Sequence, residues 1–155
     1  MEITIRKCKE SDINQIENIF KEFVAFHAAI DASFIKVEHH KELFGQYVLE
    51  NINLDTSLIL VATTNEIVIG YIFGKIQERP PVFSDIRFGF VDTICILEEY
   101  QRVGAGSRLF NELKKWFEAQ NISRIEINAA MENNKSTRFW RKIGFHPYLE
   151  RMYLD

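Results

Sequence analysis

The stretch that decides the fold reads Tyr100-Gln101-Arg102-Val103-Gly104-Ala105-Gly106-Ser107-Arg108-Leu109-Phe110. Before it lies an apolar segment, 90–97, whose β-branched and aromatic residues are typical of a strand. After it, apolar residues recur every four positions, at Leu109, Leu113 and Phe117, and this spacing predicts a helix. The stretch is therefore expected to be a glycine turn that joins a strand to the start of a helix.

This glycine turn has the properties of a phosphate site. The first amides of a helix have no partners within it, and the helix dipole is positive at this end, so both favour an anion. Gly104 and Gly106 have no Cβ, which lets phosphate oxygens come close to the backbone, and Arg102 adds a positive charge. The spacing is neither a Walker loop nor the three-glycine pattern of a dinucleotide fold. From these residues alone, a diphosphate site and a plain strand-to-helix turn both remain open.

The composition is that of one folded domain, expected to span 1–155. Of the 155 residues, 46% are hydrophobic and 26% are charged, which suffices for a hydrophobic core without stabilising disulfides or metals. The net charge of −3 disfavours nucleic acid as a partner. The two cysteines have no metal or redox spacing, so no metal is expected and a reducing compartment is favoured. The sequence has neither a signal-type start nor a membrane-length apolar run, so we expect a cytoplasmic protein without a membrane partner.

The rest of the chain predicts a mixed α/β fold. Apolar runs and alternation predict strands, and apolar residues at helical spacing predict helices. In chain order we expect a strand near 3–5, a helix from 13, a helix over 41–51, strands over 58–62, 67–76 and 88–97, the helix after the glycine turn, a strand within 122–129, a helix ending at 142, and a last strand over 145–154 interrupted at Pro147.

Three predicted helix boundaries depend on individual residues. Ser11 or Asp12 can cap the first helix, with Gln15 in the position of a capping box. Asn133 or Asn134 can cap the last helix, and Gly144 is placed to end it in the left-handed conformation.

Three motifs, in the same order, resemble those of the GNAT superfamily of N-acetyltransferases. The segment 101–106 is similar to its acyl-CoA signature, Gln/Arg-x-x-Gly-x-Gly/Ala. The segment 134–145 resembles the family's Asn-x-x-Ala-x-x-Phe-Tyr-x-Lys-x-Gly-Phe helix, and 5–12 resembles the usual opening. The predicted order β-α-α-β-β-β-α-β-α-β is also the family's order. The resemblance covers essentially the whole chain and implies the GNAT fold, a mixed and mostly antiparallel sheet flanked by helices.

The resemblance also implies where acetyl-CoA binds. In this family the donor lies where the central strand separates from its neighbour, and its pantetheine pairs with that strand, here along Ile94, Cys95 and Ile96. A backbone N–H there can donate to the thioester oxygen as that oxygen gains charge. Cofactor-binding residues implied at the turn and on the last helix are Gln101, Arg102, Val103, Gly104, Ala105, Gly106, Ser107, Asn134, Trp140 and Lys142.

Acetyl transfer to an amine needs that amine neutral and close to the thioester carbon. A carboxylate acting through water is the usual family solution, and Asp92, in an otherwise apolar strand, is the first candidate for this base. Asp92 could instead be a solvated edge carboxylate or an anchor for the substrate amine. Asn128, on the facing strand, could line the acceptor site without titrating.

The sequence departs from the family where a tyrosine commonly protonates the leaving sulfur, because this chain has Trp140. An indole N–H is a donor but not a usable acid at neutral pH. A thiol has a reference pKa of about 8.5, so a thiolate can leave without full protonation while Trp140 packs on the pantetheine. Alternatively, Tyr148 or Tyr153 supplies the acid, or the chain binds acyl-CoA with little turnover.

The implied function is acetyl-CoA-dependent transfer to the primary amine of a small molecule or peptide, and the alternative is a catalytically weak acyl-CoA sensor. Residues 26–42 and 78–88 are expected to shape the acceptor site, but they carry no pattern that identifies the acceptor. Dimers are common in the family, so a homodimer is a candidate assembly.

Overall fold

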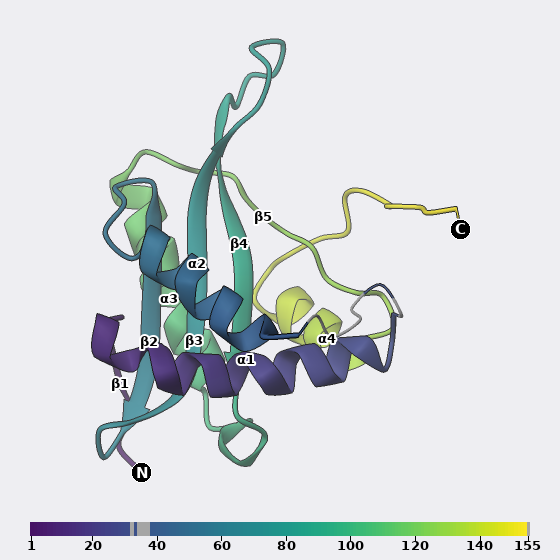
Figure 1. The fold of residues 1–155 in the computed structure, drawn as a ribbon. Coiled ribbons are helices and arrows are strands. Elements are labelled where there is room, and N and C mark those ends of the chain that lie inside the picture. The colour runs from purple at the N-terminus through teal and green to yellow at the C-terminus, as the bar shows by residue number, and fades with distance from the viewer. Residues whose placement is uncertain (32, 34–37, 155) are drawn as a thin grey trace.

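The structure, a computed structural model, describes residues 1–31, 33 and 38–154. Within that part of the chain, five strands form one sheet in the order β1-β2-β3-β4-β5. Neighbouring strands pair antiparallel except β4 and β5, which are parallel. Figure 1 shows the sheet between helices, with the long β3–β4 hairpin projecting beyond them. The strands are β1 (Thr4–Lys7), β2 (Ser57–Thr64), β3 (Ile67–Glu78), β4 (Arg87–Ile96) and β5 (Ile125–Ile127).

Helices cover both faces of the sheet (Figure 1). On one face lie α1 (Ile13–Ala28) and α2 (His40–Asn51), which also pack against each other. On the other face lies α3 (Ala105–Ala119), and α4 (Asn134–Lys142) packs beside it through aromatic contacts. The mixed α/β fold with a mostly antiparallel sheet is therefore confirmed. None of the helices in the described residues combines the length and apolarity needed to cross a bilayer.

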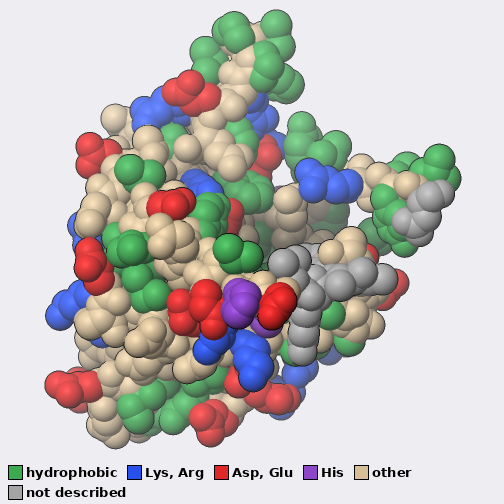
Figure 2. Space-filling view, viewed as in Figure 1, with side chains coloured by type: hydrophobic (Ala, Val, Ile, Leu, Met, Phe, Trp, Pro, Cys, Tyr) green, Lys and Arg blue, Asp and Glu red, His purple; other side chains and the backbone are tan. Residues whose placement is uncertain are grey.

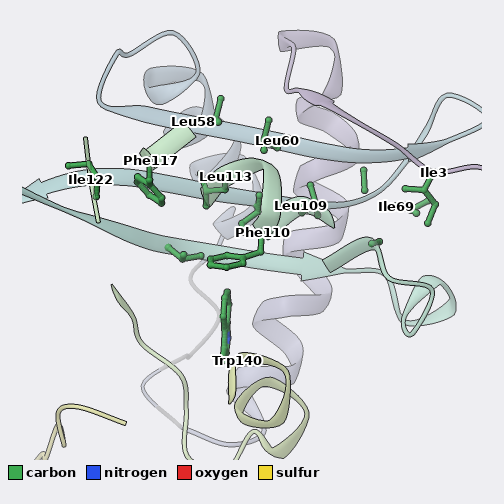
Figure 3. Close-up of a cluster of buried hydrophobic side chains, with 14 residues drawn as sticks. Ile3, Leu58, Leu60, Ile69, Leu109, Phe110, Leu113, Phe117, Ile122 and Trp140 are labelled. Carbon is green, nitrogen blue, oxygen red and sulfur yellow. The ribbon is translucent and has the colours of Figure 1, made fainter. Parts of the chain in front are cut away.

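The core between the sheet and α3 fixes the helix that follows the glycine turn. Leu109, Leu113 and Phe117 are fully buried, as their four-residue spacing predicts. Figure 3 shows these three side chains directed at the sheet, with Trp140 of α4 below Phe110. The strands contribute Leu58, Leu60, Ala62, Ile69, Ile72 and Val91 to this core.

A second core fills the opposite face of the sheet. Its buried members from α1 and α2 are Ile16, Ile19, Phe44 and Val48, and its members from the strands are Ile59, Val61, Val68, Tyr71 and Phe73. Because the strands are buried on both sides, β2 and the middle of β3 are apolar in nearly every position rather than alternating.

The predicted last strand is wrong. Residues 145–154 form no strand in the described chain, and the segment after α4 runs away from the body (Figure 1). Pro147 lacks the N–H that a ladder needs, and the charged residues Glu150 and Arg151 interrupt the apolar residues beyond it. Leu149, Met152 and Leu154 are 79%, 83% and 98% exposed. The predicted strand within 122–129 is also shorter than expected, since β5 has three residues.

The structure corrects one predicted cap and confirms two others. Asp12 is the N-cap residue of α1, but its side chain does not cap the helix, because the carboxylate accepts from Arg6 and from the N–H of Lys9. Gln15 forms no capping box, because its Oε1 accepts from the N–H of Val68 at 2.9 Å and so ties α1 to β3. Asn133 caps α4 by accepting from the N–H of Ser136 at 3.0 Å. Gly144 follows α4 with φ of 106°, the left-handed conformation expected of a helix-ending glycine.

Candidate active site

Strand β4 has a free edge at its carboxyl end. Its pairing with β5 stops at Val91, opposite Ile127, and from there to Ile96 the described chain pairs it only with β3. The N–H of Leu97 donates to the carbonyl of Ile69 on β3 at 2.9 Å. Because backbone groups alternate in direction along an antiparallel strand, those of Ile94 and Ile96 point away from β3. This edge can therefore accept an extended ligand as a further strand.

Cys95, between these two residues, is oriented differently. It pairs with Tyr71, and its side chain belongs to the second core, with Sγ 3.9 Å from the carbonyl oxygen of Ile19. Burial raises the pKa of the thiol to about 12. Cys95 is therefore part of the β4 backbone at this edge, and its buried thiol is not a reactive nucleophile.

The start of α3 is open. Gly104 has φ of 86°, and the first intrahelical bond runs from the N–H of Arg108 to the carbonyl of Gly104 at 3.1 Å. The amides of Ala105, Gly106 and Ser107 precede that bond and have no partners within the helix. A Cβ at Gly104 would meet nothing within 4 Å, whereas one at Gly106 would lie 3.4 Å from the Phe139 ring. These amides can therefore receive an anion.

The turn between the free edge and the open helix brings the two together. Gln101 donates from Nε2 to the carbonyl of Ile96 at 3.2 Å, so its side chain reaches back to the strand edge. Arg102 has φ of 67°, and Val103 is exposed. The turn places the edge of β4 and the first amides of α3 next to each other in the chain.

The three candidates on α4 lie in different surroundings. Asn134 and Lys142 are exposed at the two ends of the helix. Trp140 is 3% exposed and packs edge-to-face on Phe110 (Figure 3), with ring centroids 5.7 Å apart. Its indole N–H donates to Oγ of Ser136 at 3.1 Å. The N–H of Trp140 is therefore already used within α4.

Asp92 occupies a β-bulge. Phe73 pairs with Thr93 and Gly74 pairs with Val91, so Asp92 is the extra residue of β4. A bulge bends the strand and redirects the side chain, and bulges are frequent next to active sites. In this position the Asp92 side chain turns to the face of the sheet that α2 covers.

Two side chains contact the Asp92 carboxylate there. Lys75 Nζ lies 3.6 Å from Asp92 Oδ1, and the Tyr47 hydroxyl donates to the same oxygen at 3.3 Å. Lys75 also donates to the Tyr47 hydroxyl and lies over its ring. Burial raises the pKa of Asp92, and Lys75 opposes that effect only in part, so the pKa stays above its usual value. Sequence reasoning missed Lys75 and Tyr47, because no local spacing links α2, β3 and β4.

A second charged group lies farther along the same face. Arg79 Nη2 and Arg124 Nε donate to one oxygen of Glu126, at 2.8 and 2.6 Å. Burial raises the pKa of Glu126 and the two arginines lower it, with a net decrease. We refer to Lys75, Arg79, Asp92, Arg124 and Glu126 together as the charged face.

Tyr148 is placed at the beginning of β4 rather than at its free end. Its ring is 66% exposed and stacks on the Arg124 guanidinium at 4.6 Å, and Arg124 directly precedes β5. Figure 2 shows the surface hollowed between the β3–β4 hairpin and the C-terminal segment to which Tyr148 belongs. Asn128 is exposed just after β5. Of the predicted acceptor segment 26–42, residues 32 and 34–37 lie outside the described residues.

Comparisons with known proteins point to one family. The sequence model of the acetyltransferase (GNAT) family matches residues 16–145. The chain is 26% identical to an N-alpha-acetyltransferase of Sulfurisphaera tokodaii, over 93% of this chain and 80% of that protein. It is 25% identical to an N-alpha-acetyltransferase of Sulfolobus acidocaldarius, over 97% of this chain and 85% of that protein.

Solved structures share the fold at low sequence identity. A mutant of the BH1408 protein from Bacillus halodurans superposes with a TM-score of 0.86 at 18% identity, covering 98% of each chain. The aminoglycoside N-acetyltransferase AAC(6')-Iy, solved with the bisubstrate analogue CoA-S-monomethyl-acetylneamine, superposes with a TM-score of 0.79 at 13% identity. That match covers 100% of this chain and 98% of AAC(6')-Iy.

Proposed function

Because the chain belongs to the acetyltransferase (GNAT) family, we propose that it transfers the acetyl group of acetyl-CoA to the primary amine of a small molecule or peptide. The observation that carries this proposal is the free edge of β4 adjoining the open start of α3. A diphosphate fits the amides of Ala105, Gly106 and Ser107, and a pantetheine arm fits the outward backbone groups of Ile94 and the outward N–H of Ile96. Strand β4 would then both bind acetyl-CoA and carry the groups that act on its thioester.

When bound, acetyl-CoA supplies a thioester carbon to which the amine nitrogen bonds as the carbon–sulfur bond breaks. The outward N–H groups of Ile94 and Ile96 are the donors available to the oxygen that gains charge. Asp92 is the base that takes the proton released by the amine, directly or through one water. Its raised pKa suits this role, because a base closer to neutral pH holds the proton better than an ordinary carboxylate.

The leaving sulfur has no acid at Trp140, since that N–H bonds to Ser136. With a reference pKa of about 8.5, the thiol can leave as the thiolate. The competing function, a weak acyl-CoA sensor, is favoured only by this substitution. Release of free thiol from acetyl-CoA with an added amine distinguishes the two, because a sensor binds without releasing thiol.

Two glycine variants test the binding site. Gly104→Glu should weaken CoA binding by about 100-fold, equivalent to about 2.7 kcal/mol, because a carboxylate at the start of α3 repels the diphosphate and fills its place. Gly144→Glu is the matched control: Gly144 also has positive φ, 106°, with nothing within 4 Å of a Cβ. Each variant should cost about 1 kcal/mol of stability for a side chain at positive φ.

Calorimetric titration with CoA and thermal unfolding of both variants give the comparison. Equal CoA affinity in Gly104→Glu and wild type would refute the site. Equal loss of affinity in Gly144→Glu would show that the effect is not specific to the start of α3.

A further inference from the structure

We propose that Lys75 makes this acetyltransferase selective for weakly basic amines, such as the α-amine of an amino acid or peptide, over alkylammonium groups such as lysine side chains and polyamines. The inference rests on the proposed function, with Asp92 at the acceptor amine. It concerns a residue of β3 that precedes Asp92 by seventeen positions and that no motif includes.

Lys75 already occupies the place beside Asp92 where a substrate ammonium would bind. Its Nζ lies 3.6 Å from Asp92 Oδ1, and both side chains are 21% exposed. The Tyr47 hydroxyl holds both groups, accepting from Lys75 and donating to Asp92. An acceptor that reaches Asp92 therefore meets a fixed positive charge in a half-buried setting, where water screens charges poorly.

Glu126, the carboxylate nearest to Asp92 on the neighbouring strand, offers a cationic acceptor no second anionic site. Lys75 pairs with Phe90 of β4, and Phe90 pairs with Glu126 of β5, so the three lie in one row across the sheet. Asp92 and Glu126 are the only carboxylates in β4 and β5. Glu126 already accepts from Arg79 and Arg124. Both strand carboxylates of the charged face thus have cationic partners, which disfavours acceptors with several positive charges.

The size of the effect follows from Coulomb's law. An ammonium about 5 Å from Lys75 Nζ, at an effective dielectric of about 20, is disfavoured by roughly 300-fold in binding. A neutral amine carries no such penalty. At pH 7.5 about a third of an α-amine with pKa near 7.8 is neutral, against about one in a thousand of a lysine side chain with pKa near 10.4. The α-amine therefore enters the site in its reactive form.

The experiment measures thiol release with two peptides that each carry one amine. Ala-Gly-Ala amide presents only an α-amine, and N-acetyl-Lys-Gly amide presents only a lysine side chain. Wild type should favour the α-amine by about 100-fold or more in kcat/KM. Lys75→Met, which keeps the stem and removes the charge, should reduce this ratio at least tenfold. Lys75→Arg, which keeps the charge, should retain it.

Lys115→Met is the matched control, because Lys115 is 69% exposed on α3 and pairs only with Glu112 in the described residues. It should keep the wild-type ratio. Turnover with the same ratio in wild type and Lys75→Met, or a wild-type preference for the lysine peptide, would overturn the role of Lys75 and leave acetyl transfer standing. Absence of thiol release with both peptides in every variant would overturn acetyl transfer itself.

Discussion

Two opposed influences set the ionisation of Asp92. Burial of the carboxylate raises its pKa, and the Lys75 ammonium beside it lowers the pKa by less. The carboxylate is therefore protonated at a higher pH than an exposed aspartate, whose pKa is about 3.9. A base works only in its deprotonated form, so the activity that depends on Asp92 is present above the raised pKa and lost as the pH falls through it.

Replacing this carboxylate tests its role. Asp92→Asn should lower kcat at saturating acceptor by roughly 10² to 10⁴-fold, the usual contribution of a general base. The fall of wild-type kcat toward acid pH should also disappear from the variant. Asp55→Asn, an exposed aspartate before β2, should behave as wild type. A pH–rate profile of the three proteins provides the measurement, and an unchanged kcat in Asp92→Asn would exclude the base role.

Single residues also mark the limit of sequence reasoning. A charge in an apolar strand singled out Asp92 without any structure, and the two glycines singled out the start of α3. The partners of Asp92 could not be found in this way. Tyr47 and Lys75 reach it from α2 and β3 only because a bulge displaces one residue of β4, and the sequence carries no signal for that bulge.

The elements were predictable where burial is periodic. Leu109, Leu113 and Phe117 repeat at helical spacing because one side of α3 faces the sheet, so the helix could be predicted from them. Beyond Phe145, which packs on Phe110 and Trp140, the apolar residues Leu149, Met152 and Leu154 are exposed, and there the composition suggested a strand that does not form. Composition alone does not supply a pairing partner, and a strand exists only through its partner.

The cap of α4 offers a test with a control in the neighbouring position. Asn133→Ala should lower the free energy of unfolding by about 1 kcal/mol, because Asn133 Oδ1 accepts from the N–H of Ser136 and that amide would lose its partner. Asn134→Ala should stay within about 0.5 kcal/mol of wild type, because the Asn134 side chain is exposed. Urea unfolding of both variants measures the difference. Equal losses in the two would contradict the assignment of the cap.

The same pair separates stability from binding. Asn134 remains a predicted contact of acetyl-CoA, so Asn134→Ala is expected to weaken acetyl-CoA binding without a change in unfolding. Asn133→Ala should instead act through the helix. Titration with acetyl-CoA at a temperature where both variants are folded keeps the two effects apart.

At the scale of the whole molecule, the sheet separates two regions along β4. Its free edge, next to the start of α3, is at the carboxyl end of the strand, whereas Arg124 and Tyr148 lie beside its beginning. Five residues of strand, about 17 Å at about 3.3 Å each, separate Gly89, which bonds to the Arg124 carbonyl, from Ile94. The Tyr148 ring is exposed and stacked on Arg124. This arrangement favours departure of the thiolate without a tyrosine acid.

Separate removal of the Tyr148 hydroxyl and ring tests that arrangement. Tyr148→Phe keeps the ring over Arg124 and removes the hydroxyl, so kcat should stay within about twofold of wild type, since the exposed cation–π contact needs only the ring. Tyr148→Ala should lower the free energy of unfolding by about 0.5 to 1 kcal/mol, the usual value of an exposed cation–π contact. Thiol-release kinetics and thermal unfolding of both variants measure these effects. A tenfold lower kcat in Tyr148→Phe, with unfolding unchanged, would instead identify the hydroxyl as the acid and require the C-terminal segment to move toward the free edge during turnover.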